Sequence, residues 1–288
     1  MGPLSGPVPG ALTGTTVVVT RARGQASGLV RRLSDLGASV VELPVIAIEG
    51  PADGGAALAA AADRLVDGRY DWAVVTSANA VTRLMDAVGG RAVPAATRWG
   101  AVGTSTARSL VERGVRPDLV PGVAISDALV EAIPTAGRPG PDPGPIGGRG
   151  AVLYARAERA RDVVGPGLAA KGWRVDEVVA YRTVAGEVDP GAATAARTAD
   201  AVAFTSSSTV ERTLDLLGPS GLPPVIVSIG PVTSASLRAA GLAVSVEAVE
   251  HTLDGLVSAV AGALSGGRRP TAPGPTAPGP AEGPAPSA

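Results

Sequence analysis

Two stretches of the chain carry the same pattern of apolar and polar positions. Residues 71–86 read DWAVVTSANAVTRLMD, and residues 200–215 read DAVAFTSSSTVERTLD. Each has a short apolar run, a Thr-Ser pair and then apolar residues at helical spacing. This pattern predicts a buried parallel strand, a hydroxyl-rich turn and an amphipathic helix. Because open α/β folds bind ligands at the carboxyl ends of their strands, we expect the two turns to form two half-sites for one ligand.

Further strands and helices follow from the same kind of pattern. The β-branched run at 15–20 predicts a buried strand, and the helix after it is expected to end at Gly37 in the left-handed conformation. Residues 38–48 are predicted to be extended, with Pro44 typical of an edge strand or a linker. Residues 115–120 are also predicted to form a strand.

The order of elements then recurs in the second half of the chain. After the Pro/Gly-rich segment 134–150, a strand is again followed by arginine, so that Arg156 stands where Arg21 stood. The turns at 103–106 and 230–233 also match. The pattern therefore predicts a duplicated α/β chain with parallel sheets, two lobes and a cleft between them.

Composition narrows the possible functions. The chain of 288 residues has no cysteine, which excludes disulfides and thiolate metal sites. A net charge of −1 and 2% aromatic residues argue against a nucleic-acid partner. The first residues do not resemble a signal peptide, and no apolar run is long enough to span a membrane, so we expect a soluble cytoplasmic protein. Residues 1–14 and 266–288 are predicted to be a disordered leader and tail.

Familiar catalytic groupings are missing from the sequence. His251 is the single histidine, which makes a Ser-His-Asp relay or a histidine metal site improbable, and no metal site is predicted. Neither a GxGxxG fingerprint nor a GxxxxGK[ST] loop is present. Lys171 is the only lysine, so Schiff-base chemistry is limited to that position.

Four polar turns at predicted strand ends are the best candidates for a ligand site. Each offers backbone N–H groups at a helix start, and most offer more hydroxyls than the one that helix capping needs. Plain capping remains the alternative for any single turn. The turns are Thr76 to Asn79, Gly103 to Thr106, Thr205 to Ser208 and Gly230 to Thr233.

Arginines after the first strand of each half add positive charge to this region. Arg21 and Arg23 follow one strand, and Arg156, Arg159 and Arg161 follow its repeat. Guanidinium groups at strand ends suit carboxylates or phosphates, although a solvated surface explains them equally well. The implied ligand is a polyanion.

Tyr181 is a further candidate, because it lies in the extended segment 178–184 (VVAYRTV). If that segment crosses between the lobes, its phenol would point into the cleft. A tyrosine packed at the edge of a lobe is the alternative.

In this order and spacing, the motifs resemble the uroporphyrinogen-III synthase family. The resemblance runs from about Thr15 to Leu264 and rests on TRARGQA, VVTSANAV, AVGTSTARSL, YRT, FTSSSTVE and SIGPVTSASL.

The resemblance implies two Rossmann- or flavodoxin-like α/β lobes joined by a two-stranded β-ladder. One lobe would combine residues 15–48 and 185–265, and the other would hold 49–184, with the ladder strands at 43–48 and 178–184. The duplication alone would instead divide the chain near the Pro/Gly-rich segment. We follow the boundaries that the family implies.

The resemblance also implies an activity. The family closes linear hydroxymethylbilane to uroporphyrinogen III without a cofactor, inverting the last pyrrole ring and losing water. That substrate is a polycarboxylate, in agreement with the predicted polyanion. The family implies a monomer, with no nucleic-acid or membrane partner.

Site residues are carried over onto matching positions of this chain. Tyr181 matches the family's ladder tyrosine and would assist departure of the hydroxyl as an acid. The candidate substrate-binding residues are Arg21, Thr76, Ser77, Ala78, Gly103, Thr104, Thr106, Arg156, Thr205, Ser206, Ser207, Gly230, Pro231 and Thr233.

Two other classes of function remain open on the residues alone. One is a two-lobed, non-catalytic binding protein for a polyanionic small molecule. The other is a nucleotide-dependent sugar transferase, which the absence of a clear base or metal ligand disfavours.

Overall fold

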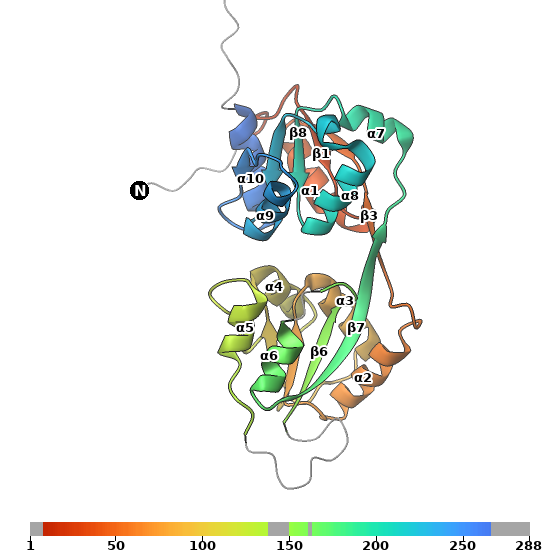
Figure 1. The fold of residues 1–288 in the computed structure, drawn as a ribbon, viewed down its shortest axis with the longest axis vertical. Helices are drawn as coiled ribbons and strands as arrows, with labels where there is room; N and C mark the ends of the chain where they lie inside the picture. The colour runs from red at the N-terminus through yellow and green to blue at the C-terminus, as the bar shows by residue number, and fades with distance from the viewer. Residues whose placement is uncertain (1–7, 138–149, 161–162, 266–288) are drawn as a thin grey trace, which may run out of the picture.

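The computed structural model describes residues 8–137, 150–160 and 163–265 as two α/β lobes (Figure 1). The sheet of the first lobe has the strand order β10-β9-β8-β1-β2, and all its neighbouring strands are parallel. Its strands are β1 (Thr16–Val19), β2 (Ser39–Glu42), β8 (Ala201–Phe204), β9 (Val225–Ser228) and β10 (Val246–Glu247).

The second sheet has the order β3-β7-β6-β4-β5. Its strands are β3 (Ile46–Glu49), β4 (Trp72–Val75), β5 (Arg98–Ala101), β6 (Ala151–Ala157) and β7 (Arg174–Ala185). Each sheet therefore combines strands from both halves of the duplicated sequence. The predicted fold class, two mainly parallel α/β lobes, is confirmed.

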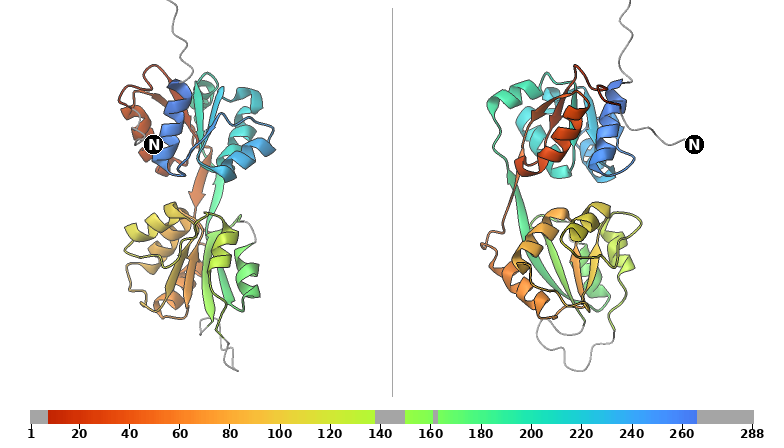
Figure 2. Two further views of the ribbon diagram at one scale, coloured as in Figure 1. Left: turned by 90° about the vertical axis from the view of Figure 1, so that its left-hand side faces the viewer. Right: turned by 180° about the vertical axis from the view of Figure 1, so that it is seen from behind.

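Helices cover both faces of each sheet, which buries the strands (Figures 1 and 2). β4 and β8 are buried at every position, as the apolar runs predicted. In the first lobe the helices are α1 (Arg23–Asp35), α7 (Pro190–Ala196), α8 (Ser207–Leu217), α9 (Pro231–Ala239) and α10 (Leu253–Ser265). In the second lobe they are α2 (Ala56–Val66), α3 (Ala78–Val88), α4 (Thr104–Glu112), α5 (Ser126–Ala132) and α6 (Val164–Ala170).

A two-stranded antiparallel ladder joins the lobes. β7 first pairs in parallel with β6 and then continues towards the first lobe, where its last residues pair with β3. In this ladder Ile48 is opposite Thr183, and Glu49 is opposite Arg182. An ion pair of 2.8 Å joins Arg182 to Glu49. The predicted ladder is confirmed, with its pairing at 46–49 and 182–185.

Local signals in the sequence set several helix ends. Gly37 has a φ of +91°, a conformation that glycine adopts without strain, and it follows α1 as predicted. The Thr252 hydroxyl accepts a hydrogen bond from the Gly255 N–H at the start of α10. None of the helices in the described part of the chain combines the length and hydropathy needed to span a bilayer.

Two expectations differ from the structure. The leader prediction is wrong for residues 8–14, because Leu12 is fully buried in the core beside α1 and its N–H donates to the Leu36 carbonyl. The predicted strand at 115–120 is reduced to a single bridge between Leu119 and Gly100. The disordered parts predicted at 1–7 and 266–288 lie outside the described residues, as does most of the segment 134–150.

Candidate functional site

The four helices that follow the polar turns begin where the two lobes face each other. α3 and α4 start at the carboxyl ends of β4 and β5, and α8 and α9 start at the carboxyl ends of β8 and β9. In Figure 1 these helix starts border the space between the lobes, with the ladder along one side. Free N–H groups at helix starts favour anions, so both walls of this space are suited to an acidic ligand.

A cavity of about 260 Å³, the central pocket, lies between the lobes and the ladder. Its wall combines residues far apart in the sequence. They are Arg21, Ala22, Gln25, Thr205, Ser206, Ser208 and Ile229 of the first lobe, Ala78, Asn79 and Ser105 of the second, and Ile46, Ile48, Tyr181 and Thr183 of the β3–β7 segments.

Arg21 is the main positive group of the central pocket. It follows the end of β1, and its Nε atom is buried without a hydrogen-bond partner. Burial lowers the pKa of the guanidinium, which nevertheless stays charged near neutrality. Among the described residues no carboxylate pairs with it. A buried cation without a counter-charge is a strong attractor for a carboxylate ligand.

Tyr181 lines the same pocket from β7, immediately before the ladder pairing begins. The residue is 8% exposed, and its backbone carbonyl accepts a hydrogen bond from the Glu158 N–H. The phenol is thus held on a strand that is fixed at both ends. A phenolic O–H in this position can donate a hydrogen bond or a proton to a bound ligand.

Several hydroxyls of the polar turns are already used by the protein. Ser77 caps α3 by accepting from the Ala80 N–H at 3.1 Å, and Ser206 caps α8 by accepting from the Thr209 N–H at 3.4 Å. Thr106 and Thr233 are buried, and the Ser207 hydroxyl accepts a hydrogen bond of 2.7 Å from Ser236. Ser77 and Ser206 act here only as acceptors, so that their own O–H groups stay available as donors, and Ser105, Thr205, Ser206 and Ser208 line the central pocket.

The two glycine turns place backbone in close contact with the next loop. Gly103 and Gly230 begin α4 and α9 without a side-chain cap. A Cβ on Gly103 would lie 2.7 Å from the Ala124 Cβ, and one on Gly230 would lie 3.0 Å from the His251 ring. The Ala124 contact leaves no room for a side chain at Gly103, whereas at Gly230 the exposed His251 ring would have to shift slightly. Thr104 and Pro231 are the exposed first residues of the two helices.

The structure gathers some of the predicted residues and pairs others within a lobe. Arg21, Ala78, Thr205, Ser206 and Tyr181 line the central pocket. Arg156, by contrast, forms an ion pair of 2.8 Å with Glu177 in its own lobe. Thr76 forms a hydrogen bond with Tyr154. Burial raises the pKa of Tyr154, and this hydrogen bond partly offsets the rise.

Sequence reasoning missed a side-chain contact between the lobes. The Gln25 amide donates a 2.5 Å hydrogen bond to the Asn79 amide oxygen, joining the start of α1 to the start of α3. Asn79 belongs to one of the polar turns, and Ser208 stands at the matching position of the repeat and lines the same pocket. The repeat could have identified both residues.

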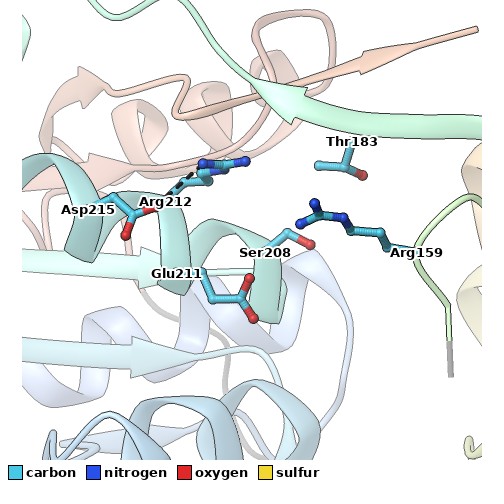
Figure 3. Close-up of a pocket in the computed structure, with 6 residues that line it drawn as sticks. All are labelled: Arg159, Thr183, Ser208, Glu211, Arg212 and Asp215. Atoms are coloured by element: carbon cyan, nitrogen blue, oxygen red, sulfur yellow. Dashed lines mark hydrogen bonds and ion pairs between the residues drawn. The ribbon is translucent and has the colours of Figure 1, made fainter.

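The central pocket continues into two side pockets. The first, of about 440 Å³, is called here the Arg83 pocket and shares Ala22, Gln25, Ile48 and Asn79 with the central pocket. It also contains Arg23, Thr82, Arg83 and Asp86. The second, of about 310 Å³, shares Thr183 and Ser208 and is called the Arg212 pocket (Figure 3); it also contains Arg159, Glu211, Arg212 and Asp215.

Comparison with known proteins identifies relatives of this chain. The family model described as uroporphyrinogen-III synthase HemD matches residues 27–258. A uroporphyrinogen-III synthase from Synechococcus elongatus is 33% identical over 270 residues, covering 86% of this chain and 95% of its own length.

Solved structures share the fold. A mutant uroporphyrinogen III synthase from Thermus thermophilus has a TM-score of 0.60 at 22% identity, covering 88% of this chain and all of its own. A uroporphyrinogen-III synthetase from Helicobacter pylori has a TM-score of 0.52 at 16% identity, covering 84% of this chain and 96% of its own.

Proposed function

The chain belongs to the uroporphyrinogen-III synthase family, and we propose that it closes hydroxymethylbilane to uroporphyrinogen III with inversion of the last pyrrole ring and loss of water. The enzyme is a cyclising lyase of tetrapyrrole biosynthesis. The observation that carries this proposal is the central pocket, which both Arg21 and Tyr181 line. It lies between two lobes whose helix starts face each other.

The carboxylates of the linear tetrapyrrole would bind along both walls of the cleft. Backbone N–H groups at the starts of α3, α4, α8 and α9 would donate hydrogen bonds to these carboxylates, and Arg21 supplies a full positive charge. We place the substrate against the turns that begin at Thr76, Gly103, Thr205 and Gly230. Arg156 remains a proposed substrate-binding residue, although it forms an ion pair with Glu177 in its own lobe.

Tyr181 would serve as the acid in the first step. Its O–H donates a proton to the departing hydroxyl, which leaves as water, while electrons from the pyrrole nitrogen form the azafulvene. The last ring attacks through its substituted carbon to give a spiro intermediate, which rearranges and closes with that ring inverted. The tyrosinate then recovers a proton, which the ring system loses as it becomes aromatic again.

Positioning accounts for most of the required catalysis. The linear substrate closes without help to the non-inverted isomer, so the protein must hold the last ring where its substituted carbon reacts first. Fixing two reacting groups in one geometry can lower a barrier by roughly 7–11 kcal/mol. A cleft lined by anion-binding groups and one phenol is consistent with this task.

We also propose a lobe boundary and an oligomeric state. The boundary assigns 15–48 with 185–265 to one lobe and 49–184 to the other; it fits the strand composition of the two sheets except at the ladder, where β3 (46–49) pairs with β7 of the second sheet. The monomeric state that the family resemblance implies is likewise a proposal. The cytoplasmic location remains a prediction from the sequence.

The test is a product assay. Hydroxymethylbilane is generated in situ, the protein is added, and the oxidised isomers are resolved by chromatography. We expect isomer III to dominate and to form faster as protein concentration rises. Formation of isomer I alone, at the rate seen without protein, would contradict the enzyme and favour a binding protein for polyanions.

A further inference from the structure

The two side pockets are copies of one pocket produced by the internal duplication. α3 lines the Arg83 pocket, and α8 lines the Arg212 pocket with residues at the matching positions of the repeat. The matched pairs are Asn79 with Ser208, Thr82 with Glu211, Arg83 with Arg212 and Asp86 with Asp215. Ile48 lines one pocket and Thr183 the other, and these two residues are partners in the ladder. The cleft therefore has an approximate two-fold symmetry about this pair.

The charges of the two copies differ. In the Arg212 pocket, the guanidinium groups of Arg159 and Arg212 are balanced by the carboxylates of Glu211 and Asp215. Figure 3 shows these side chains around one space, with Arg212 paired to Asp215 at 3.5 Å. The charges of this pocket cancel, so it does not attract an anion.

In the Arg83 pocket, the matching aspartate is held elsewhere. Asp86 forms a 2.6 Å ion pair with Arg113, the residue that follows α4, and Arg113 does not line the pocket. Among the described residues, Arg83 has no carboxylate partner and donates a 3.3 Å hydrogen bond to the Ile48 carbonyl. Arg23 adds a second positive charge. The Arg83 pocket is thus positive, whereas its copy is neutral.

We propose that the Arg83 pocket binds one carboxylate side chain of the linear tetrapyrrole and thereby selects the direction in which the substrate lies in the cleft. The proposal rests on the proposed function. A cleft with two-fold symmetry would accept a linear tetrapyrrole in either direction. Only one direction is productive, because Ile46 stands at the repeat position of Tyr181 in the same pocket and has no proton to donate. An anion subsite on one side alone removes this ambiguity.

The first test compares Arg83→Gln with Arg212→Gln, the same change in the two copies. A hydrogen bond to a charged group contributes about 1.5 kcal/mol, so Arg83→Gln should lower kcat/KM for isomer III roughly tenfold. Arg212→Gln should change it less than about twofold, because an exposed ion pair contributes little. Melting curves of both variants check that the fold is kept.

The second test changes the charge of the pocket without altering Arg83. Arg113→Gln releases Asp86, whose carboxylate then neutralises Arg83 as Asp215 neutralises Arg212. We expect a severalfold loss in kcat/KM, and Asp86→Asn added to Arg113→Gln should restore it. A purely structural role for Arg113 would not be rescued by removing its partner.

The outcomes separate the two proposals. Wild-type protein that forms no isomer III contradicts the proposed function itself. If the wild type is active, equal kcat/KM values for wild type, Arg83→Gln and Arg113→Gln overturn the subsite. If Arg83→Gln lowers stability, its kcat/KM is not used, and the comparison of Arg113→Gln with the double variant Arg113→Gln/Asp86→Asn tests the subsite instead. If the double variant does not regain kcat/KM, the subsite is overturned.

Discussion

Replacing Arg21 with methionine should make the protein more stable and less active at the same time. The guanidinium is partly buried, its Nε atom has no partner, and no carboxylate in the described part of the chain compensates its charge. An unsatisfied buried polar group costs about 1–3 kcal/mol. Methionine keeps an unbranched stem of similar length and removes this cost.

The loss of activity follows from the same atoms. If Arg21 binds a substrate carboxylate, removal of that charge-assisted hydrogen bond costs about 1.5–3 kcal/mol, or roughly 10- to 150-fold in kcat/KM. The gain in stability should raise the melting midpoint by roughly 2–4 °C for each kcal/mol. Differential scanning calorimetry and the isomer assay measure the two effects.

The control is Arg31→Met, an exposed position on α1, which should change neither quantity appreciably. A lower melting midpoint with unchanged kcat/KM for Arg21→Met would refute the reasoning. In that case the Arg21 guanidinium would stabilise the fold rather than bind the substrate.

Four further substitutions test other parts of the account. Tyr181→Phe should lower kcat about 100-fold or more while product affinity stays within about threefold, and unchanged turnover would remove the acid role. Gly186→Ala should destabilise by about 1–3 kcal/mol, because a Cβ there would overlap the Pro44 carbonyl oxygen at the ladder; an unchanged melting midpoint would contradict this. Burial raises the pKa of both Tyr70 and Tyr154, and for Tyr70 a hydrogen bond to Asp176 raises it further. The stability that these raised pKa values contribute is complete below the unfolded value of about 10 and is lost as pH rises above it. Alkaline unfolding curves should therefore flatten in Tyr70→Phe and Tyr154→Phe, and identical curves would argue against both shifts.

The repeated strand–turn–helix units could be predicted from the sequence, because local signals define them. Short apolar runs give the buried strands β4 and β8, and Gly37 ends its helix with a positive φ. The exchange of strands between the halves could not be derived in this way. The repeat alone would have divided the chain near 134–150, whereas the antiparallel pairing of β3 with β7 depends on contacts between distant segments. The family resemblance supplied this information.

The candidate site was predicted in outline rather than in detail. Of the predicted hydroxyls, Thr205 and Ser206 line the central pocket, whereas Thr106 and Thr233 are buried, and Ser77 and Ser206 also cap helices as acceptors. A sequence shows that a hydroxyl lies at a helix start, but its orientation depends on the packing around it. The same limit applies to Arg156, whose partner Glu177 comes from the neighbouring strand.

The two side pockets show what the repeat could and could not predict. It gave the matching positions of Arg83 and Arg212 on two helices. It could not show that Arg113, which follows α4, pairs with Asp86 and leaves Arg83 without a carboxylate partner among the described residues. Such a difference in charge appears only when side chains from separate elements are placed together.

The central claim is that one tetrapyrrole is held by both lobes at once. Amide hydrogen exchange with and without uroporphyrinogen III, kept reduced under anaerobic conditions, measures this directly at the helix starts. We expect the product to slow exchange at the first residues of α3 and α4 and, in the same titration, at those of α8 and α9. Protection confined to one lobe, with the other unchanged at saturating product, would contradict the account.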